Sequence, residues 1–505
     1  MTKRFTKILI ANRGEIALRV MRTCREMGIK TVAVFSEADR RAGHVLFADE
    51  AYYIGPSPSN ESYLKYETIL EVALKASVSA IHPGYGFLSE NTDFAAKVTA
   101  SGITFIGPPS EAIRLMGDKT MARQAMIKAN IPVVPGTEKP IDNTGDALRV
   151  AENIGFPVLI KAAGGGGGKG MRIVEKKEEF MEAVSRAQGE AKSAFSDSRV
   201  YIEKYLEEPH HIEFQILADA HGNIVHLGER ECSIQRRYQK VVEESPSVFI
   251  DDKIREAMGK VAISVAKSCQ YLGAGTVEFL VDKHRQFYFL EMNTRLQVEH
   301  PVTEMVTGID LVAEQIRIAE GHPISFKQED IRHNGHAIEC RIYAEDAKNN
   351  FAPSIGTIHH LFTPDGPGTR LDSALYAGQQ VTPYCDPMLG KLITWGRNRE
   401  DALRRMDRAL SEFFISGIET SISFCRAVIN HPRFQSGTYD THFYKHFCDD
   451  LVESMMAHDE ETFIAAAGTH IFSETKIHSS EQSAYSTASE RPSNWVMANR
   501  KGLDR

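Results

Sequence analysis

Polar and charged side chains occupy every second position of one short segment, residues 291–299, and their types suit both metal and anion binding. In an extended chain, residues two apart point the same way, so one face of this segment would carry all of them together. A solvated edge strand could show the same alternation, but such strands are usually rich in Lys and Thr. The pattern therefore favours a functional site, whose members are Glu291, Asn293, Arg295, Gln297 and Glu299.

A β-hairpin is predicted just before this segment. Residues 276–281 and 286–291 form two β-rich runs, and residues 282–285 separate them as a turn. Pairing about that turn places Glu278 and Glu291 on one face as diagonal neighbours. Two carboxylates this close repel each other unless a cation lies between them, and hard oxygen ligands favour Mg²⁺ or Mn²⁺ over zinc. Because Mg²⁺ usually completes its shell with phosphates and water, the pair predicts a nucleotide site. A hairpin with two surface glutamates is the alternative.

A glycine run follows a predicted strand, residues 156–160, and Lys161. Without side chains, its backbone N–H groups can approach an anion, and the segment can move as a lid. The run is not a Walker loop, because Met171 follows Gly170 where that motif requires Lys. A flexible linker is the alternative, but the strand that ends at Lys161 favours a phosphate-binding loop. The loop consists of Gly164, Gly165, Gly166, Gly167 and Gly168.

Length and composition limit the class of protein. The 505 residues predict about three domains, and 42% hydrophobic with 25% charged residues is ordinary for a soluble globular chain. The net charge of −8 provides no basic field, so we expect no nucleic-acid partner. The seven cysteines are scattered without a Cys-x-x-Cys pair, which argues against zinc and disulfides and indicates a reducing compartment. With no signal peptide or membrane-spanning run, we expect a cytoplasmic protein without a membrane partner.

Strands and helices alternate in the first part of the chain, which predicts a parallel open sheet. The stretch from His82 to Glu90 follows a strand end, where such sheets bind ligands, although a Pro/Gly turn with an aromatic anchor remains an alternative. A single helix is predicted from Ile113 to Ala129. The earlier predicted elements are strands at residues 7–11, 31–35, 80–81 and 103–106, and a helix from Glu15 to Met27.

Two further features leave alternatives open. His210 and His211 are adjacent in a predicted strand, so they face opposite sides and should not share a metal. A single His that faces phosphate and a hydrogen-bonded structural His are both consistent with this position. Arg341 lies among apolar neighbours and needs an anionic partner. That partner is either a substrate or an internal carboxylate such as Glu339 or Glu345.

Six motifs in order resemble those of the biotin carboxylase family of ATP-grasp ligases, up to about residue 448. They are Asn12 to Ala17, His82 to Gly86, the glycine loop, Glu231 to Arg237, Glu291 to Pro301, and Arg341 to Asp346. The resemblance implies an α/β fold with a three-domain ATP-grasp architecture. Its parts would be an N-terminal Rossmann-like domain (residues 1–115), an ATP-grasp domain (116–330) with a mobile lid at about 133–204, and a C-terminal mixed α+β domain (331–448). Residues 449–505 would form a partly disordered tail.

The resemblance implies ATP-dependent carboxylation of biotin by bicarbonate, via carboxyphosphate, with two Mg²⁺ or Mn²⁺ ions. The implied nucleotide contacts are Lys119, Lys161 and the glycine loop at the phosphates, Glu203, Lys204 and Leu206 at the adenine, and His211 and Gln235 elsewhere. Glu278 and Glu291 match the metal carboxylates, with Asn293 beside them. Tyr238 stands where the family usually has His, and it can still donate a hydrogen bond to a ribose.

For the chemical step, the resemblance implies a bicarbonate site made of Lys240, Arg295, Gln297 and Val298. Glu299 matches the general base that deprotonates bicarbonate, and Arg341 matches the residue that stabilises the biotin enolate. Bicarbonate is a weak nucleophile and carboxyphosphate hydrolyses readily. A cationic pocket with a positioned base would activate bicarbonate, and a closing lid would protect carboxyphosphate from water.

The same resemblance implies partners, and two competing functions can be weighed against it. No Ala-Met-Lys-Met biotinylation motif follows residue 448, so we expect a free-standing homodimeric subunit that works with a biotin carboxyl carrier protein and with a carboxyltransferase subunit. The final acceptor stays open between acetyl-CoA, propionyl-CoA, another acyl-CoA and pyruvate. A carbamoyl-phosphate-forming ligase would need a second glycine loop, and no such repeat is visible. A regulatory protein that had lost catalysis would be expected to lack Glu299, Arg341 or the metal pair.

Overall fold

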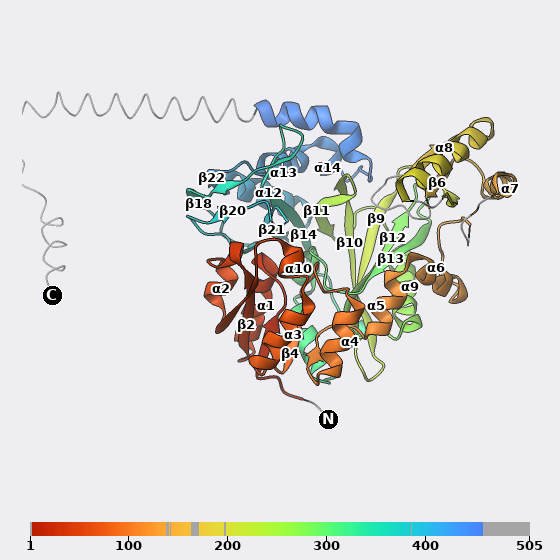
Figure 1. Cartoon of the computed structure of the whole chain (residues 1–505). Coiled ribbons are helices and arrows are strands. Elements are labelled where there is room, and N and C mark those ends of the chain that lie inside the picture. Colours follow the sequence, from red (N-terminus) through yellow and green to blue (C-terminus); the bar gives the residue numbers. More distant parts are fainter. Residues whose placement is uncertain are drawn as a thin grey trace, which may run out of the picture. The chain divides into compact units, whose positions relative to one another are not determined.

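The computed structural model describes residues 3–137, 141, 143–162, 171–195, 198–384 and 386–457 of the chain (Figure 1). The chain divides into two compact units, residues 1–448 and 449–505, and every element named below belongs to the first unit. Within the described ranges, no helix has both the length and the apolar composition needed to cross a membrane.

The N-terminal region contains a five-stranded parallel sheet in the order β3-β2-β1-β4-β5. Its central strands are buried on both faces, as expected when helices cover a parallel sheet. The predicted parallel open sheet is therefore confirmed. The strands are β1 (Lys7–Ile10), β2 (Lys30–Ser36), β3 (Glu50–Gly55), β4 (Ala80–His82) and β5 (Thr104–Phe105), and the helices are α1 (Gly14–Glu26), α2 (Gly43–Phe47), α3 (Tyr66–Lys75) and α4 (Thr92–Ala100).

The single helix predicted from Ile113 to Ala129 is wrong, because two helices occupy this stretch. They are α5 (Ser110–Gly117) and α6 (Lys119–Lys128). Asp118 lies between them in an extended conformation, and its side chain accepts hydrogen bonds from two backbone N–H groups of the first turn of α6. An aspartate that caps a new helix in this way ends the preceding one. As a consequence, Lys119 lies at the exposed start of α6.

An eight-stranded antiparallel sheet forms the middle of the first unit, in the order β13-β12-β9-β10-β11-β14-β21-β19. The sheet contains strands from both sides of the domain limit predicted at residue 330, because β11 pairs directly with β14. The strands are β9 (His210–Ala218), β10 (Ile224–Arg236), β11 (Gln239–Ser245), β12 (Gly273–Val281), β13 (Phe287–Asn293), β14 (His336–Tyr343), β19 (Thr369–Ser373) and β21 (Met388–Gly396). The accompanying helices are α9 (Asp252–Ser268), α10 (His300–Thr307), α11 (Leu311–Ala319), α12 (Arg399–Glu412), α13 (Ile422–Asn430) and α14 (Pro432–Gln435).

A smaller three-stranded sheet, β7-β6-β8, packs with two helices around its own apolar cluster. Its elements are α7 (Thr144–Ile154), β6 (Val158–Ala162), β7 (Met171–Val174), α8 (Lys177–Phe195) and β8 (Val200–Lys204). Two-stranded sheets complete the described fold. They pair β15 (Glu345–Asp346) with β16 (Ala352–Pro353), β17 (Gly356–Thr357) with β20 (Gln380–Val381), and β18 (His360–Phe362) with β22 (Phe414–Ser416).

One buried carboxylate links β11 to the helices after β21. Glu244 accepts hydrogen bonds from Arg399 (Nε 2.7 Å and Nη2 3.0 Å), from His336 (Nε2 2.5 Å) and from the hydroxyl of Tyr439. Burial alone would raise the pKa of Glu244, but Arg399 and His336 lower it from 4.5 to about 2. A carboxyl whose pKa falls on folding stabilises the folded state above its unfolded pKa.

We therefore predict that Glu244 stabilises the protein at neutral pH and that this contribution is lost as the pH falls from 4.5 through about 2. Glu244→Gln should lower the free energy of unfolding at pH 7 by about 3 kcal/mol and flatten its dependence on pH over that window. Urea unfolding followed by circular dichroism between pH 3 and 7 measures both quantities. The control is Glu37→Gln, which breaks an exposed pair with Arg40 and should change little. Equal acid slopes in wild type and Glu244→Gln would contradict the assignment.

Candidate active site

The polar segment after the hairpin is not one extended strand. β13 ends at Asn293, residues 294–299 turn, and α10 begins at His300. The side chains converge nevertheless, because Asn293 Nδ2 and Gln297 Nε2 each donate to Glu278 Oε1 at 2.8 Å. Arg295 donates to Asn293 Oδ1 at 3.1 Å and to Gln297 Oε1 at 3.0 Å. The prediction of one strand face is wrong beyond residue 293, but the predicted gathering of these groups is confirmed.

The loop after β4 holds one end of this turn. Glu90 accepts hydrogen bonds from the Thr294 backbone N–H (2.9 Å) and from Arg295 Nε (2.7 Å). The loop itself is tied to the end of β1 by Asn12, whose Nδ2 donates to two of its carbonyls at 2.8 and 2.7 Å. Gly84 has a φ of +65°, and a Cβ there would lie 2.9 Å from that nitrogen, so only glycine fits. The loop is thus a Gly/Pro turn that also orients Arg295.

The two hairpin carboxylates are direct partners, not the predicted diagonal neighbours. Glu278 pairs with Glu291 in the antiparallel register, because an irregularity next to Glu278 leaves Leu290 as an extra residue in β13. Their environments differ. Burial and the neighbouring Glu278 raise the pKa of Glu291, and Lys119 Nζ lies 3.9 Å from Glu291 Oε2. Burial opposes ionisation of Glu278, but Lys240 and His211 hold its pKa well below the usual range. Glu278 therefore ionises at a lower pH than Glu291.

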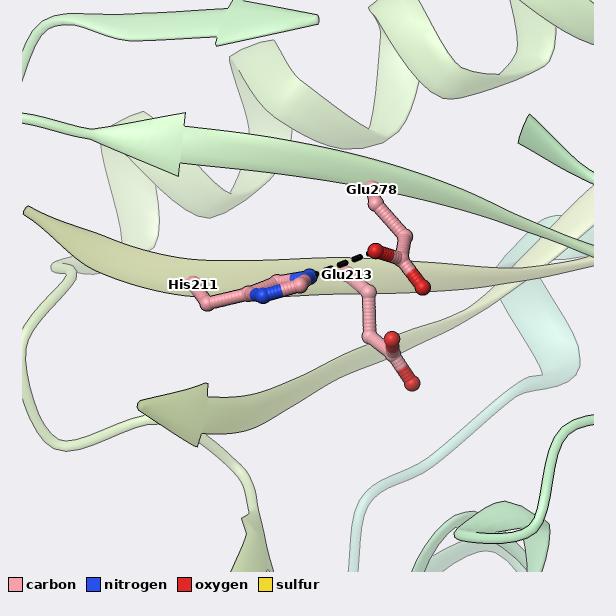
Figure 2. A group of neighbouring side chains, drawn as sticks. All are labelled: His211, Glu213 and Glu278. Carbon is pink, nitrogen blue, oxygen red and sulfur yellow. Dashed lines mark hydrogen bonds and ion pairs between the residues drawn. The ribbon is translucent and has the colours of Figure 1, made fainter. Parts of the chain in front are cut away.

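Figure 2 shows His211, Glu213 and Glu278 side by side, the first two from β9 and the third from β12. His211 Nε2 lies 2.7 Å from Glu278 Oε2, and its Nδ1 accepts a hydrogen bond from Gln235 Nε2 at 2.8 Å. These contacts assign the Nε2–H tautomer. His210 faces the other side of the strand, where it stacks on Phe249 at 3.6 Å. The prediction that the two histidines face opposite sides of the strand is confirmed.

Lys240 supplies a positive charge to the same group of side chains. Its Nζ lies 2.5 Å from Glu213, 3.0 Å from Glu278 and 2.7 Å from Glu299. Burial alone would lower the pKa of Lys240, but the three carboxylates raise it well above the usual range. Glu213 is already bound by Lys240 and Arg230, and His211 already bonds Glu278, so we assign no metal to His211, Glu213 and Glu278 together. Glu213 was not among the predicted site residues, although its place two residues after His211 puts both side chains on one strand face.

Arg341 meets two carboxylates, and neither is one of the two proposed from the sequence. Its guanidinium donates to Glu243 Oε1 from Nε at 2.6 Å and to Glu299 Oε2 from Nη2 at 3.0 Å. Glu345 instead binds Arg236 at 3.1 Å, and no described residue donates a hydrogen bond to Glu339. The partners of Arg341 are distant in sequence: Glu243 lies on β11 and Glu299 lies in the turn before α10.

Glu299 is therefore shared between two cations, Lys240 and Arg341, and it is fully buried. Burial alone would raise its pKa, but the two cations hold the pKa of Glu299 well below the usual range. The carboxylate is consequently ionised at neutral pH. An ionised, oriented and buried carboxylate is one requirement for a general base.

The remaining predicted residues that the structure describes lie on or just after the smaller sheet and at the β10–β11 hairpin. Lys161 forms an ion pair with Glu203 on the neighbouring strand. Lys204 Nζ donates to the carbonyls of residues 155 and 156, and Leu206 is buried. Tyr238 is 70% exposed at the hairpin tip. Gly164, Gly165, Gly166, Gly167 and Gly168 lie outside the described residues.

Comparison with known proteins decides the family. Residues 4–113 match the biotin carboxylase N-terminal domain, residues 118–327 the carbamoyl-phosphate synthase L chain ATP-binding domain, and residues 339–446 the biotin carboxylase C-terminal domain. Biotin carboxylase of Nostoc sp. is 54% identical over 440 residues, which are 87% of this chain and 98% of that protein. The chain belongs to the biotin carboxylase family. Its activity is ATP-dependent carboxylation of biotin by bicarbonate, the first half-reaction of the acyl-CoA carboxylases.

Two further relatives extend this result. A pyruvate carboxylase subunit of Methanothermobacter thermautotrophicus is 51% identical over 460 residues, which are 90% of this chain and 94% of that protein. The biotin carboxylase domain dimer of the Hydrogenobacter thermophilus 2-oxoglutarate carboxylase was solved with MgADP, ADP and bicarbonate. It has a TM-score of 0.82 and 48% identity, covering 89% of this chain and 99% of that one. Since biotin carboxylase domains flank the ATP-binding match, the carbamoyl-phosphate alternative is wrong.

The contacts of Glu299 generate a prediction that separates chemistry from nucleotide binding. Glu299→Gln keeps the side-chain shape but cannot accept a proton, so kcat should fall roughly a hundredfold or more. ATP affinity should change little, because Glu299 contacts Lys240 and Arg341 and not the Lys161–Glu203 pair. Nucleotide titration beside steady-state turnover measures both quantities.

The matched control is Glu203→Gln, which removes the partner of Lys161 and should alter nucleotide affinity more than Glu299→Gln does. Normal turnover in Glu299→Gln would show that another group takes the proton.

Proposed function

We propose that this chain is a biotin carboxylase subunit that carboxylates biotin on a separate carrier protein through carboxyphosphate. The observation that carries the proposal is the position of Glu299 between Lys240 and Arg341. Arg295, Gln297 and the backbone at Val298 lie on the turn that leads into Glu299, and they would bind bicarbonate. As bicarbonate binds Lys240 and Arg295, Glu299 would lose part of its cationic contact, so its pKa would rise towards that of a useful base.

The nucleotide would lie between the smaller sheet and the β12–β13 hairpin. Its proposed contacts are Lys119, Lys161, Glu203, Lys204, Leu206, His211, Gln235 and Tyr238, with the glycine loop over the phosphates. Glu278 and Glu291 fit a Mg²⁺ or Mn²⁺ site, because both are hard carboxylate donors on one face of a hairpin and one of them is held ionised. Asn293 lies beside them, and its amide oxygen meets Arg295. When bound, the metal would neutralise phosphate charge.

Arg341 would act on biotin rather than on bicarbonate. A guanidinium presents a planar set of donors that suits an enolate oxygen. In the described structure, Arg341 Nε donates to Glu243 and Arg341 Nη2 donates to Glu299. We propose that Glu243 is the group that orients Arg341, which leaves the face towards Glu299 for biotin.

We also propose the partners. A carrier protein would present biotin, a carboxyltransferase subunit would use carboxybiotin, and the chain would form a homodimer, which is the state of the Hydrogenobacter thermophilus domain. The acceptor stays open, because the relatives include propionyl-CoA carboxylase alpha chains and one subunit of a pyruvate carboxylase. The domain limits proposed from the sequence are residues 1–115, 116–330 and 331–448.

The overall proposal predicts metal-dependent ATP cleavage that requires bicarbonate and that rises with free biotin or a biotinylated carrier. Phosphate release, measured with and without bicarbonate after removal of dissolved CO₂, is the test. A strong dependence is expected because Lys240 on β11 stays paired with Glu278 and Glu299 until a bicarbonate anion takes up part of this contact. Equal rates with and without bicarbonate would exclude this function.

The proposed role of Arg341 predicts that its replacement uncouples phosphate release from the carboxylation of biotin. Arg341→Lys keeps the charge without the planar fork, and Arg341→Ala loses both. Both variants should still cleave ATP in the presence of bicarbonate but carboxylate little biotin, because the enolate contact exists mainly in the transition state. The measurement is the ratio of phosphate released to biotin carboxylated. A wild-type ratio together with lower thermal stability would show that Arg341 is only a structural partner of Glu243 and Glu299.

A further inference from the structure

A fully buried lysine lies behind the proposed bicarbonate turn. Lys391 belongs to β21, and its side chain is 0% exposed. Its Nζ donates to the backbone carbonyl of Val298 at 3.0 Å and lies 3.2 Å from Glu15 Oε1. Asp372 on β19 is 3.9 Å away. Burying an ammonium costs several kcal/mol unless it is paired and hydrogen-bonded, so a lysine here needs these partners.

The three partners come from regions far apart in the sequence. Glu15 lies in the first turn of α1 beside the N-terminal sheet, Val298 lies in the turn before α10, and Asp372 lies on the last strand of the large sheet. Lys391 also pairs in register with Arg341 on β14. One side chain therefore connects the N-terminal region, the proposed bicarbonate turn and the strand beside the proposed biotin-binding arginine.

The turn depends on such contacts because residues 294–299 belong to no strand. At its first end, Glu90 binds the Thr294 N–H and Arg295. At its last end, Lys391 binds the Val298 carbonyl, and His300 Nδ1 contacts the Gln297 carbonyl at 2.8 Å. The described turn is thus held from outside at both ends.

We propose that Lys391 is a positioning residue that fixes the Val298 carbonyl and thereby sets the bicarbonate affinity of the turn. The inference rests on the proposed bicarbonate site. Lys391 does not touch the substrate in this proposal; it acts through the backbone of Val298. A residue that only joined regions of the fold would change stability without favouring one substrate over another.

The test compares Michaelis constants for the two small substrates in the full-length chain. Lys391→Met keeps the apolar stem but removes the donor. It should raise the KM for bicarbonate roughly tenfold to a hundredfold, the effect of losing a hydrogen bond from a charged donor, while the KM for ATP stays within about twofold. Lys391→Arg retains a cationic donor and should recover part of the bicarbonate affinity.

A second variant separates positioning from folding. Burial raises the pKa of Glu15 to about 7 even beside Lys391, so without the lysine this carboxyl would take up a proton. The double variant Lys391→Met/Glu15→Gln contains neither charge and should fold at least as well as Lys391→Met. It should nevertheless keep the raised KM for bicarbonate. Glu15→Gln alone leaves the contact between Lys391 and Val298 and should keep a KM close to that of wild type.

The matched control is Arg399→Met, which removes a partly buried cation without touching the turn, since Arg399 binds Glu244. It should lower thermal stability and leave the KM for bicarbonate unchanged. Unchanged bicarbonate KM values in Lys391→Met and in the double variant would overturn the inference, as would equal increases for bicarbonate and ATP. Absence of bicarbonate dependence in the wild type would instead overturn the proposed function itself.

Discussion

The interaction on which the site depends is the sharing of one buried carboxylate by two cations. Glu299 is fully buried, and Lys240 and Arg341 both bind it. Each of these charges would cost several kcal/mol alone in the interior, so each needs ionic partners there. The arrangement requires β11, β14 and the turn before α10 to meet. The direct pairing of β11 with β14 brings the two cations onto neighbouring strands.

The same neutralisation explains how an anionic substrate enters a site crowded with carboxylates. Every cation proposed to bind bicarbonate already has an internal partner: Lys240 binds Glu213, Glu278 and Glu299, and Arg295 binds Glu90. Under the proposed function, substrate binding would therefore be an exchange of ionic contacts and not the filling of a bare positive pocket. An exchange of this kind changes the proton affinity of the carboxylate that is displaced. Binding of the correct anion would thus make Glu299 a stronger base.

The sequence predicted the elements better than the contacts between them. The parallel sheet, the β12–β13 hairpin and the opposite orientation of His210 and His211 follow from local rules of periodicity and turn chemistry. The diagonal placement of Glu278 and Glu291 was wrong for two reasons that leave no clear sign in composition. The turn is one residue longer than predicted, so Val281 pairs with Phe287, and the extra residue in β13 shifts the register by one more. The long helix over residues 113–129 was wrong because Asp118 caps a second helix, a signal that was visible in the sequence.

The partners of the buried cations were harder to predict, for a physical reason. Glu339 and Glu345 were proposed for Arg341 because they are close in sequence, whereas Glu243 reaches it through pairing between strands almost a hundred residues apart. Charge compensation in an interior is decided by which strands adjoin, and a single sequence does not determine that order. Glu213 and Lys391 were missed for the same reason, since nothing in the apolar strands around them shows which opposite charge they will meet.

The turn of residues 294–299 shows how the backbone of a site can be held in one geometry without regular secondary structure. Strand pairing fixes a backbone through repeated hydrogen bonds, but a turn has few of its own. Here the missing bonds come from side chains outside it, Glu90 near the N-terminal sheet and Lys391 on β21. Because these two side chains belong to different regions of the fold, the geometry of the turn depends on how those regions pack together. A substitution at either contact would therefore alter the proposed bicarbonate site while leaving every residue of the turn unchanged.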